Sequence, residues 1–245
     1  MKFGIVGFGR FGKLWAQALS SFGEVLVYDK SGNLSDNTKI QMTTLPEVAN
    51  ADVIFIIVPI SQFEECCLEL NKYISPKAVV IDCCSVKTHP VQVMRKIFSK
   101  QQSLVATHPL FGPDSVSKSG GMTNHQIVVC AIQCDEIKLE QVNKIFQGMG
   151  LNIITATPEE HDKQMANSQG LVHFIGRGLA ALQLHPQELA TPDFQALLNI
   201  NKMVVNDSWQ LFLDMHKYNP YTKSIRNKFI KQLAKIDEEV NKNVN

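Results

Sequence analysis

Two polar segments in the first half of the chain carry side chains that could move a proton, and each follows an apolar run. One is Asp82 to Lys87, and the other is Thr107-His108-Pro109. If the two runs are neighbouring parallel strands, their carboxyl ends meet at the sheet edge where α/β proteins bind ligands. A histidine at that edge can accept a proton or a hydrogen bond from a substrate hydroxyl. By position alone, His108 could equally be a loop histidine bonded to backbone.

A glycine-rich loop near the amino terminus predicts a dinucleotide site. The apolar run Lys2–Val6 leads into a GxGxxG pattern, and a helical pattern follows. Gly7 would allow a tight turn, Gly9 would let bare backbone approach a pyrophosphate, and Gly12 would let the helix pack closely on the sheet. Unpaired N–H groups at the helix start would attract the phosphates. The loop residues expected at the cofactor are Gly7, Phe8, Gly9, Arg10, Phe11 and Gly12.

An acidic residue at the end of the second apolar run indicates which dinucleotide binds. Asp29 lies about 20 residues beyond the first glycine, where a carboxylate can accept hydrogen bonds from an adenosine ribose. The same carboxylate repels a 2′-phosphate, so we predict NAD rather than NADP, although Lys30 could offset part of the repulsion. Val58 and Pro59, which end the third strand, are also expected at the cofactor site. The alternative is a glycine-rich turn that binds nothing.

The order of apolar runs predicts the fold. Strands alternate with helices over residues 1–157, which is typical of a Rossmann-type, doubly wound parallel sheet. The polar segment 31–41 is predicted to be a loop. From Pro158 onward the pattern is helical, with four helices. We therefore predict an α/β fold with a dinucleotide-binding domain at 1–157, followed by a smaller all-α domain for substrate binding and dimerisation at 158–245.

The composition argues against several classes of function. Lys and Arg number 24 and Asp and Glu number 23, which argues against nucleic acid or an anionic membrane as the main partner. No apolar run has the length of a membrane span. The six cysteines show neither zinc-ligand spacing nor a disulfide framework. We expect no metal, and reduced thiols in a cytoplasmic protein are the simplest interpretation.

The first helix of the all-α domain offers a second group of polar side chains. His161-Asp162 opens this helix, and Ser168 lies seven residues beyond His161 and shares its face. In an ideal α-helix, His173 lies about 140° further round than Ser168 and points elsewhere. Each residue alone is more often an ordinary helix-surface group than a catalytic one. On one helix facing the sheet edge, they indicate a site.

Taken in their order along the chain, the motifs resemble those of the prephenate/arogenate dehydrogenase family of tyrosine biosynthesis. The resemblance covers most of the chain. Its most specific element is the sequence HPxxGP, which begins at His108. Parts of the helical domain, including Gly176-Arg177, are closer to the plant-type arogenate enzymes. The motifs that carry the resemblance are the glycine loop, Asp82-x-x-Ser85-x-Lys87, Thr107-His108-Pro109-x-x-Gly112-Pro113, and His161-Asp162-x-x-x-Ala166-x-Ser168-Gln169-x-x-x-His173.

The resemblance implies a reaction and roles for these residues. The reaction is hydride transfer to NAD from the ring carbon that bears a hydroxyl, with loss of the ring carboxylate as carbon dioxide, and aromatisation drives it. His108 would hydrogen-bond that hydroxyl, and Ser85 would sit between the hydroxyl and the nicotinamide. The residues implied in binding substrate or shaping its site are Lys87, His161, Asp162, Ser168, His173 and Arg177.

One departure from the family pattern leaves the substrate open. Many prephenate-specific members carry a Met-Trp-Arg-Asp element, which this chain lacks, so Arg177, Lys202 and Arg226 are the candidates to meet a substrate carboxylate. We predict prephenate as substrate and 4-hydroxyphenylpyruvate as product, with arogenate, converted to tyrosine, as the alternative. Two rival hypotheses are a β-hydroxyacid or imine reductase that uses Lys163, and an NAD-binding regulator without turnover.

A homodimer through the helical domain is also predicted, and the family resemblance points the same way. Four helices form a thin layer that cannot bury all its own apolar side chains. The side chains concerned are Leu179, Leu182, Leu197, Leu198, Met203, Trp209, Leu211, Phe212 and Met215.

Overall fold

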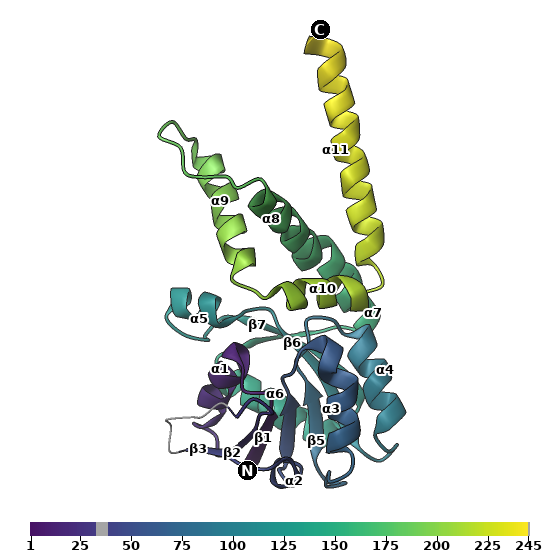
Figure 1. Cartoon of the computed structure of the whole chain (residues 1–245). Coiled ribbons are helices and arrows are strands. Elements are labelled where there is room, and N and C mark those ends of the chain that lie inside the picture. Colours follow the sequence, from purple (N-terminus) through teal and green to yellow (C-terminus); the bar gives the residue numbers. More distant parts are fainter. Residues whose placement is uncertain (33–38, 245) are drawn as a thin grey trace. The chain divides into compact units, whose positions relative to one another are not determined.

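The computed structural model describes residues 1–32 and 39–244 (Figure 1). The chain divides into two compact units, Met1–His161 and Asp162–Asn245. Helix α7 (Pro158–Met165) runs through this division. The predicted domain boundary after residue 157 lies one helical turn earlier and stays a prediction.

The first unit is built on a sheet whose topology places ligands at one edge. Its strands are β1 (Lys2–Val6), β2 (Glu24–Tyr28), β3 (Ile40–Met42), β4 (Val53–Ile56), β5 (Val79–Asp82), β6 (Ser103–Pro109), β7 (Gln126–Gln133) and β8 (Asn152–Thr155). Within the described ranges they form an eight-stranded sheet of order β3-β2-β1-β4-β5-β6-β7-β8. The strand order reverses between β1 and β4, and such switch points hold ligands at the carboxyl ends of the strands. The predicted Rossmann-type fold is confirmed.

The direction of β7 differs from the predicted all-parallel sheet. β7 runs antiparallel to β6, with His108 opposite Val128, and β8 then runs parallel to β7. The helix between them, α5 (Pro113–Ser119), has seven residues. At 1.5 Å per residue, it spans about 10 Å, whereas a seven-residue strand spans about 23 Å. The connection therefore leaves β7 starting at the edge where β6 ends.

The predicted loop at 31–41 is also corrected at its end. Residues 33–38 lie outside the described residues. Ile40–Met42 forms β3, which pairs in parallel with β2 through Val25 opposite Ile40. A strand of three residues gives too short an alternation to be recognised from sequence.

The helices of the first unit lie around the sheet (Figure 1). They are α1 (Arg10–Leu19), α2 (Leu45–Val48), α3 (Phe63–Leu70), α4 (Thr88–Ile97), α5 and α6 (Glu136–Gly148), with a short 3₁₀ turn, η1 (Ile60–Gln62). Trp15 of α1 is fully buried, and its ring centroid lies 5.7 Å from that of Phe55 in β4 and 5.9 Å from that of Phe146 in α6. α1 and α6 therefore cover the same face of the sheet. Truncating aromatic residues in such a core typically lowers the free energy of unfolding by about 3–5 kcal/mol.

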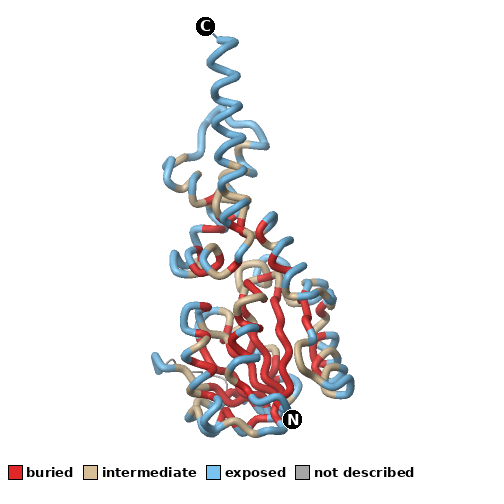
Figure 2. Tube along the Cα trace, turned by 90° about the vertical axis from the view of Figure 1, so that its right-hand side faces the viewer, coloured by how far each residue is buried: buried red, intermediate tan, exposed pale blue. Residues whose placement is uncertain are grey.

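The second unit is helical, as predicted. A π-helical turn, η2 (Ala166–Gly170), continues α7 and leads into α8 (Leu171–Ala181); α9 (Pro192–Val205), α10 (Trp209–Tyr218) and α11 (Thr222–Val244) follow. Side-chain oxygens of Thr191 and Ser208 cap α9 and α10. Buried residues concentrate on the strands of the first unit, while α11 is exposed along nearly all its length (Figure 2). Among the described helices, none combines the length and apolar character that crossing a membrane requires.

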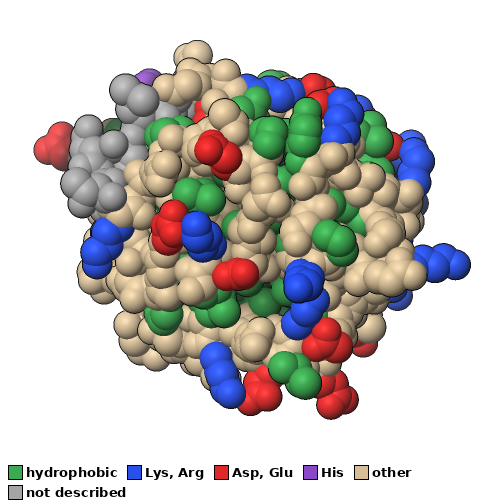
Figure 3. Space-filling view, turned by 90° about the horizontal axis from the view of Figure 1, so that it is seen from below, with side chains coloured by type: hydrophobic (Ala, Val, Ile, Leu, Met, Phe, Trp, Pro, Cys, Tyr) green, Lys and Arg blue, Asp and Glu red, His purple; other side chains and the backbone are tan. Residues whose placement is uncertain are grey.

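Charge is distributed evenly over the part of the first unit seen in Figure 3. There, acidic and basic side chains are interspersed with apolar ones. This agrees with the balanced composition of the chain.

In the loop between β1 and α1, close packing requires glycine at two of the three positions of the motif. Gly7 has a φ of 104°, and a Cβ on it would lie 2.2 Å from the carbonyl oxygen of Ile57. A Cβ on Gly12 would lie 2.2 Å from the carbonyl oxygen of Gly7, so the helix start packs directly on the turn. By contrast, a Cβ on Gly9 would have no heavy atom within 4 Å. Backbone there is open to a ligand, as predicted for a pyrophosphate site.

Substituting two of these glycines tests the packing of the loop. Gly12→Ala should lower the free energy of unfolding by about 1–3 kcal/mol, because its methyl group meets backbone that cannot rotate away. Gly9→Ala should unfold at the wild-type temperature, since its φ of −70° suits alanine and the space is empty. Thermal unfolding followed by circular dichroism measures both. Equal melting temperatures for the two variants would contradict this account of the loop.

Candidate active site

The start of α1 offers backbone donors beside the glycine loop. Gly9 is the N-cap of α1 and makes no side-chain capping hydrogen bond. The first N–H groups of a helix lack partners within the helix and carry partial positive charge, which suits a phosphate. Arg10 forms an ion pair with Asp114 of α5, with 2.5 Å between Nη2 and Oδ1. The residues present therefore fit a dinucleotide pyrophosphate at Gly9.

Asp29 is held against the same loop. Its Oδ2 accepts a hydrogen bond of 2.5 Å from the backbone N–H of Phe8, and its Oδ1 accepts one of 2.8 Å from Ser31 N–H. The neighbouring Lys30 side chain forms an ion pair with Glu65 of α3, with 2.7 Å between Nζ and Oε1. The hydrogen bond with Glu65 raises the pKa of Lys30. Lys30 is thus charged. Its partner, the carboxylate of Glu65, is a residue that no sequence motif singled out.

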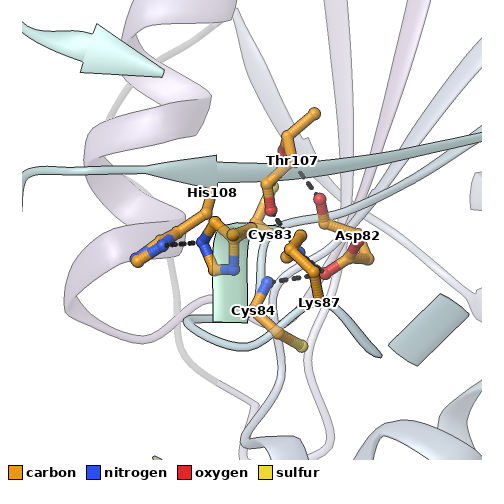
Figure 4. Close-up of polar contacts among 7 residues, drawn as sticks. Asp82, Cys83, Cys84, Lys87, Thr107 and His108 are labelled. Atoms are coloured by element: carbon orange, nitrogen blue, oxygen red, sulfur yellow. Dashed lines mark hydrogen bonds and ion pairs between the residues drawn. The ribbon is translucent and has the colours of Figure 1, made fainter. Parts of the chain in front are cut away.

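A buried lysine connects the ends of β5 and β6. Lys87 is fully buried, and its ammonium donates hydrogen bonds to Asp82 Oδ1 and, at 2.5 Å, to the backbone carbonyl of Thr107 (Figure 4). Cys84 N–H also donates to Asp82 Oδ1 at 2.8 Å, and the Thr107 hydroxyl donates to the Asp82 carbonyl at 2.7 Å. Burial raises the pKa of Asp82, while Lys87 and the Cys84 N–H oppose that rise. These contacts fix the backbone immediately before His108.

His108 contacts a second histidine. Its Nδ1 lies 2.8 Å from Nε2 of His161, and both side chains are buried. Burial is the largest cause that keeps the pKa of His108 well below its usual value, and His161 and Lys87 lower it further. His108 is therefore neutral at pH 7. If His108 Nδ1–H donates to His161, its Nε2 remains a proton acceptor, which is the form that a general base requires.

The other predicted residues of the first unit lie around this edge. Ser85 is half-buried in the loop between Asp82 and Lys87. Val58 and Pro59 lie two and three residues beyond the end of β4. Lys87 was expected to bind substrate; its observed contacts are with the protein, and a contact with substrate stays a prediction.

The predicted residues of the second unit lie in different surroundings. Ser168 is exposed and donates a hydrogen bond of 2.8 Å to the carbonyl of Gln164. His173 is buried, with Nε2 3.7 Å from Asp207 Oδ2. The π-helical turn η2 contains Ser168, and its wider turn brings residues five apart closer to one face than an α-helix does. The angle of about 140° expected between Ser168 and His173 therefore does not hold.

Arg177 and Asp162 are also placed within the second unit. The Arg177 guanidinium donates to the backbone carbonyl of Asp207 and lies over the Trp209 ring, 5.3 Å from its centroid. Nε of Arg177 and Nδ1 of His173 are buried without a hydrogen-bond partner among the described residues. Asp162 is buried, and its carbonyl accepts a hydrogen bond of 2.8 Å from Asn219.

The cysteines show no catalytic character. None of the six, all of which lie among the described residues, forms a disulfide, and burial raises the pKa of Cys66 and of Cys83 to about 12. Such thiols remain protonated at pH 7 and are poor nucleophiles. Among the described residues, no group of His, Cys, Asp and Glu is arranged to hold a metal ion.

Comparison with protein families identifies the first unit. The model described as "Prephenate dehydrogenase, nucleotide-binding domain" matches residues 22–155, which is more than half of the chain. The chain belongs to the prephenate dehydrogenase family. A model described as "TYRAAT1-like, C-terminal domain" matches residues 178–245. The predicted family is thus confirmed, and the first unit is the family's nucleotide-binding domain.

Similar proteins in this family include longer chains. The probable arogenate/prephenate dehydrogenase of Methanocaldococcus jannaschii is 26% identical over 96% of this chain and 56% of its own. Arogenate dehydrogenase 1, chloroplastic, of Arabidopsis thaliana is 26% identical over 89% of this chain and 36% of its own. This chain therefore spans between about a third and just over a half of those two relatives.

Solved structures share the fold. Prephenate dehydrogenase from A. aeolicus, in complex with hydroxyphenyl propionate and NAD+, has 20% sequence identity and a TM-score of 0.77, and covers 100% of this chain and 92% of its own. Synechocystis arogenate dehydrogenase has 20% identity and a TM-score of 0.69, covering 98% and 92%. At 20% sequence identity, the similarity to these structures shows a shared fold.

Removing the buried ammonium tests whether Lys87 supports this edge. Lys87→Met leaves Asp82 buried without its counter-charge and should lower the free energy of unfolding by about 3–5 kcal/mol. Without Lys87, the pKa of Asp82 in the folded protein lies even further above its pKa in the unfolded chain. The folded state then binds more protons than the unfolded state. The variant should therefore lose stability as pH rises above about 4.

Urea unfolding at several pH values measures this effect. The double variant Asp82→Asn/Lys87→Met should recover part of the loss, because no buried charge remains. Lys96→Met, which breaks the exposed pair with Glu64, is the control and should change stability little. A Lys87→Met protein as stable as the Lys96→Met protein would show that the buried pair does not support the fold.

Proposed function

We propose that this protein catalyses NAD-dependent oxidative decarboxylation of prephenate to 4-hydroxyphenylpyruvate. The observation that carries the proposal is a neutral, buried His108 at the carboxyl end of β6, on the same edge of the sheet as a glycine loop that is open at Gly9. Membership of the prephenate dehydrogenase family supports the same reaction. The family also disfavours the reductase that would use Lys163, whose ammonium lies 5.6 Å from the Tyr221 ring centroid.

The cofactor would be held by the glycine loop and by Asp29. Backbone N–H groups at the start of α1 bind the pyrophosphate, and the Asp29 carboxylate accepts hydrogen bonds from the adenosine ribose. Bound NAD supplies the acceptor for the hydride that leaves the substrate ring. The carboxyl ends of β4, β5 and β6 place Val58, Ser85 and His108 along one edge.

His108 would act as the general base that accepts the proton of the substrate's ring hydroxyl. With Nδ1 donating to His161, Nε2 accepts the hydrogen bond from the hydroxyl and then its proton. Lys87 holds the Thr107 carbonyl and so fixes the approach of the imidazole. Ser85 would complete the alignment of substrate and cofactor. Positioning and this single proton transfer are what the protein contributes, because aromatisation drives the reaction.

We assign the binding of a negatively charged substrate carboxylate to a residue of the second unit. Arg177 offers a buried Nε without a partner among the described residues, close to aromatic rings that exclude water, and His173 offers a buried Nδ1. A guanidinium binds a carboxylate well in such surroundings. We therefore assign Arg177 to a substrate carboxylate, with His173, Ser168 and Asp162 shaping the site.

Arogenate is the second candidate substrate. Relatives from Arabidopsis thaliana are named arogenate dehydrogenases, and the match over residues 178–245 is to a TYRAAT1-like domain. Those relatives are named chloroplastic, so the cytoplasmic location predicted here stays a prediction. Mixing the protein with NAD and either prephenate or arogenate, and following NADH absorbance, tests the proposal. NADH formation with neither substrate would overturn it, and formation with arogenate alone would select the alternative.

His108→Asn tests the proton transfer. Asparagine keeps a polar group of similar reach but cannot take a proton, so kcat should fall at least about a hundredfold while KM changes much less. In the wild type, kcat should rise with pH through a midpoint below about 6.5, since burial lowers the pKa of His108. His185→Asn, in an exposed loop, is the control. If His108→Asn raises only KM, His108 is a binding residue.

The homodimer is also part of the proposal, with the second unit as interface. Phe212 and Met215 of the predicted set are buried within the chain, whereas Leu182, Met203 and Trp209 are exposed. α11 adds a row of exposed apolar side chains on one face: Ile230, Leu233, Ile236, Val240 and Val244. An exposed row of this length is a common mark of a protein interface.

Light scattering at micromolar concentration tests the dimer. The wild type should have twice the chain mass of 27.4 kDa. Ile230→Asp should give the single mass, because the charge would be buried at the interface. Ser224→Asp places the same charge at an exposed position at least about 120° round the helix from every member of the row and should remain dimeric. A wild type of single mass would rule out the dimer.

A further inference from the structure

An ion pair joins the two segments that follow the neighbours of β1 in the sheet. Lys30 follows the end of β2, and Glu65 lies in the first turn of α3, which follows β4. β1 lies between β2 and β4 in the sheet. The contact of 2.7 Å between Lys30 Nζ and Glu65 Oε1 therefore spans the carboxyl end of β1, where the glycine loop begins.

The pair lies next to the carboxylate assigned to the adenosine ribose. Asp29 precedes Lys30 in the chain and is fixed by the N–H groups of Phe8 and Ser31. Asp29, Lys30 and Glu65 together carry a net charge of −1. A ribose 2′-phosphate, with a charge close to −2 at pH 7, would be repelled by that set.

Without Glu65, the surroundings of the Lys30 ammonium would suit a ribose 2′-phosphate. Lysine is a common phosphate ligand because its ammonium is a compact charge on a flexible stem. Removing the Glu65 charge would bring the net charge of the three positions to zero and release Lys30 from its ion pair. Asp29 alone would then oppose a 2′-phosphate.

We propose that Glu65 determines cofactor specificity by holding Lys30 in an ion pair, so that the site selects a dinucleotide with a free ribose 2′-hydroxyl. The inference rests on the proposed function, in that a dinucleotide binds at the glycine loop with its ribose at Asp29. Glu65 acts through Lys30 and through its own charge. Both side chains are largely exposed, so the pair contributes little to the stability of the fold.

The neighbouring residue provides a matched control. Glu64 also lies in the first turn of α3 and also pairs with a lysine, Lys96 of α4, at 2.9 Å. That pair joins α3 to α4 and involves no residue of the β2 end. Glu64→Gln therefore removes the same charge from the same helix turn while leaving Lys30 paired.

The experiment compares two probes that differ only in the 2′-phosphate, namely adenosine 2′,5′-bisphosphate and 5′-AMP. Their dissociation constants are measured by calorimetry for the wild type, Glu65→Gln and Glu64→Gln. Glu65→Gln should bind the bisphosphate about tenfold more tightly than the wild type and bind 5′-AMP with a much smaller change. Glu64→Gln should show no such gain. The gain should shrink as salt is raised from about 20 mM to about 500 mM, because exposed charges are screened.

A double variant isolates the role of Lys30. Lys30→Ala/Glu65→Gln should lose most of the gain, since the ammonium that would meet the phosphate is absent. In turnover, Glu65→Gln should raise kcat/KM for NADP relative to NAD by a similar factor. If Glu65→Gln and Glu64→Gln bind the bisphosphate alike, or if the double variant keeps the full gain, the inference is overturned. A wild type that binds neither 5′-AMP nor NAD would instead overturn the proposed function.

Discussion

A charged ammonium buried between two strand ends is the interaction on which the reacting edge depends. Lys87 has no exposed surface, and transferring an ammonium from water into such a place is unfavourable by several kcal/mol. Asp82 and the Thr107 carbonyl offset that loss because both accept hydrogen bonds from it. The pairing holds only when the ends of β5 and β6 are in register. The lysine therefore converts a sheet edge into a fixed platform for the residue that follows, His108.

The same burial gives His108 its chemical character. A histidine removed from water and placed near a lysine and a second histidine resists protonation, so its neutral form predominates at pH 7. His161 lies against the Nδ1 side of the His108 ring, so Nε2 of His108 is not engaged by that contact. The buried Lys87–Asp82 pair and the lowered pKa of His108 therefore have one physical cause, which is the exclusion of water from these polar groups.

The part of the sheet edge around the glycine loop is built differently from the ends of β5 and β6. Around Gly9, the loop relies on open space and on backbone donors, and the Arg10–Asp114 pair beside it is exposed. Exposed pairs such as Lys30–Glu65 contribute little to folding but set the local charge that an incoming dinucleotide meets. A change in an exposed pair alters local charge with little effect on the fold, whereas a change in the buried pair near β5 and β6 affects the fold itself.

The sequence by itself determined the order of the elements, the glycine loop, the polar strand ends and the family. These follow from local periodicity and from motifs whose spacing is set within a few turns of chain. Gly7 and Gly12 are closely packed, as their spacing predicted, and the space beside Gly9 is open. The N-caps of α9 and α10, Thr191 and Ser208, are likewise local features of the sequence.

Only the tertiary structure decided how distant residues meet. The contact between His108 and His161 joins positions 53 residues apart, and the pair of Lys30 with Glu65 joins positions 35 residues apart. The direction of β7 depended on how far α5 could carry the chain. In each case, the outcome was set by sheet order and packing, which bring together groups that no local pattern relates.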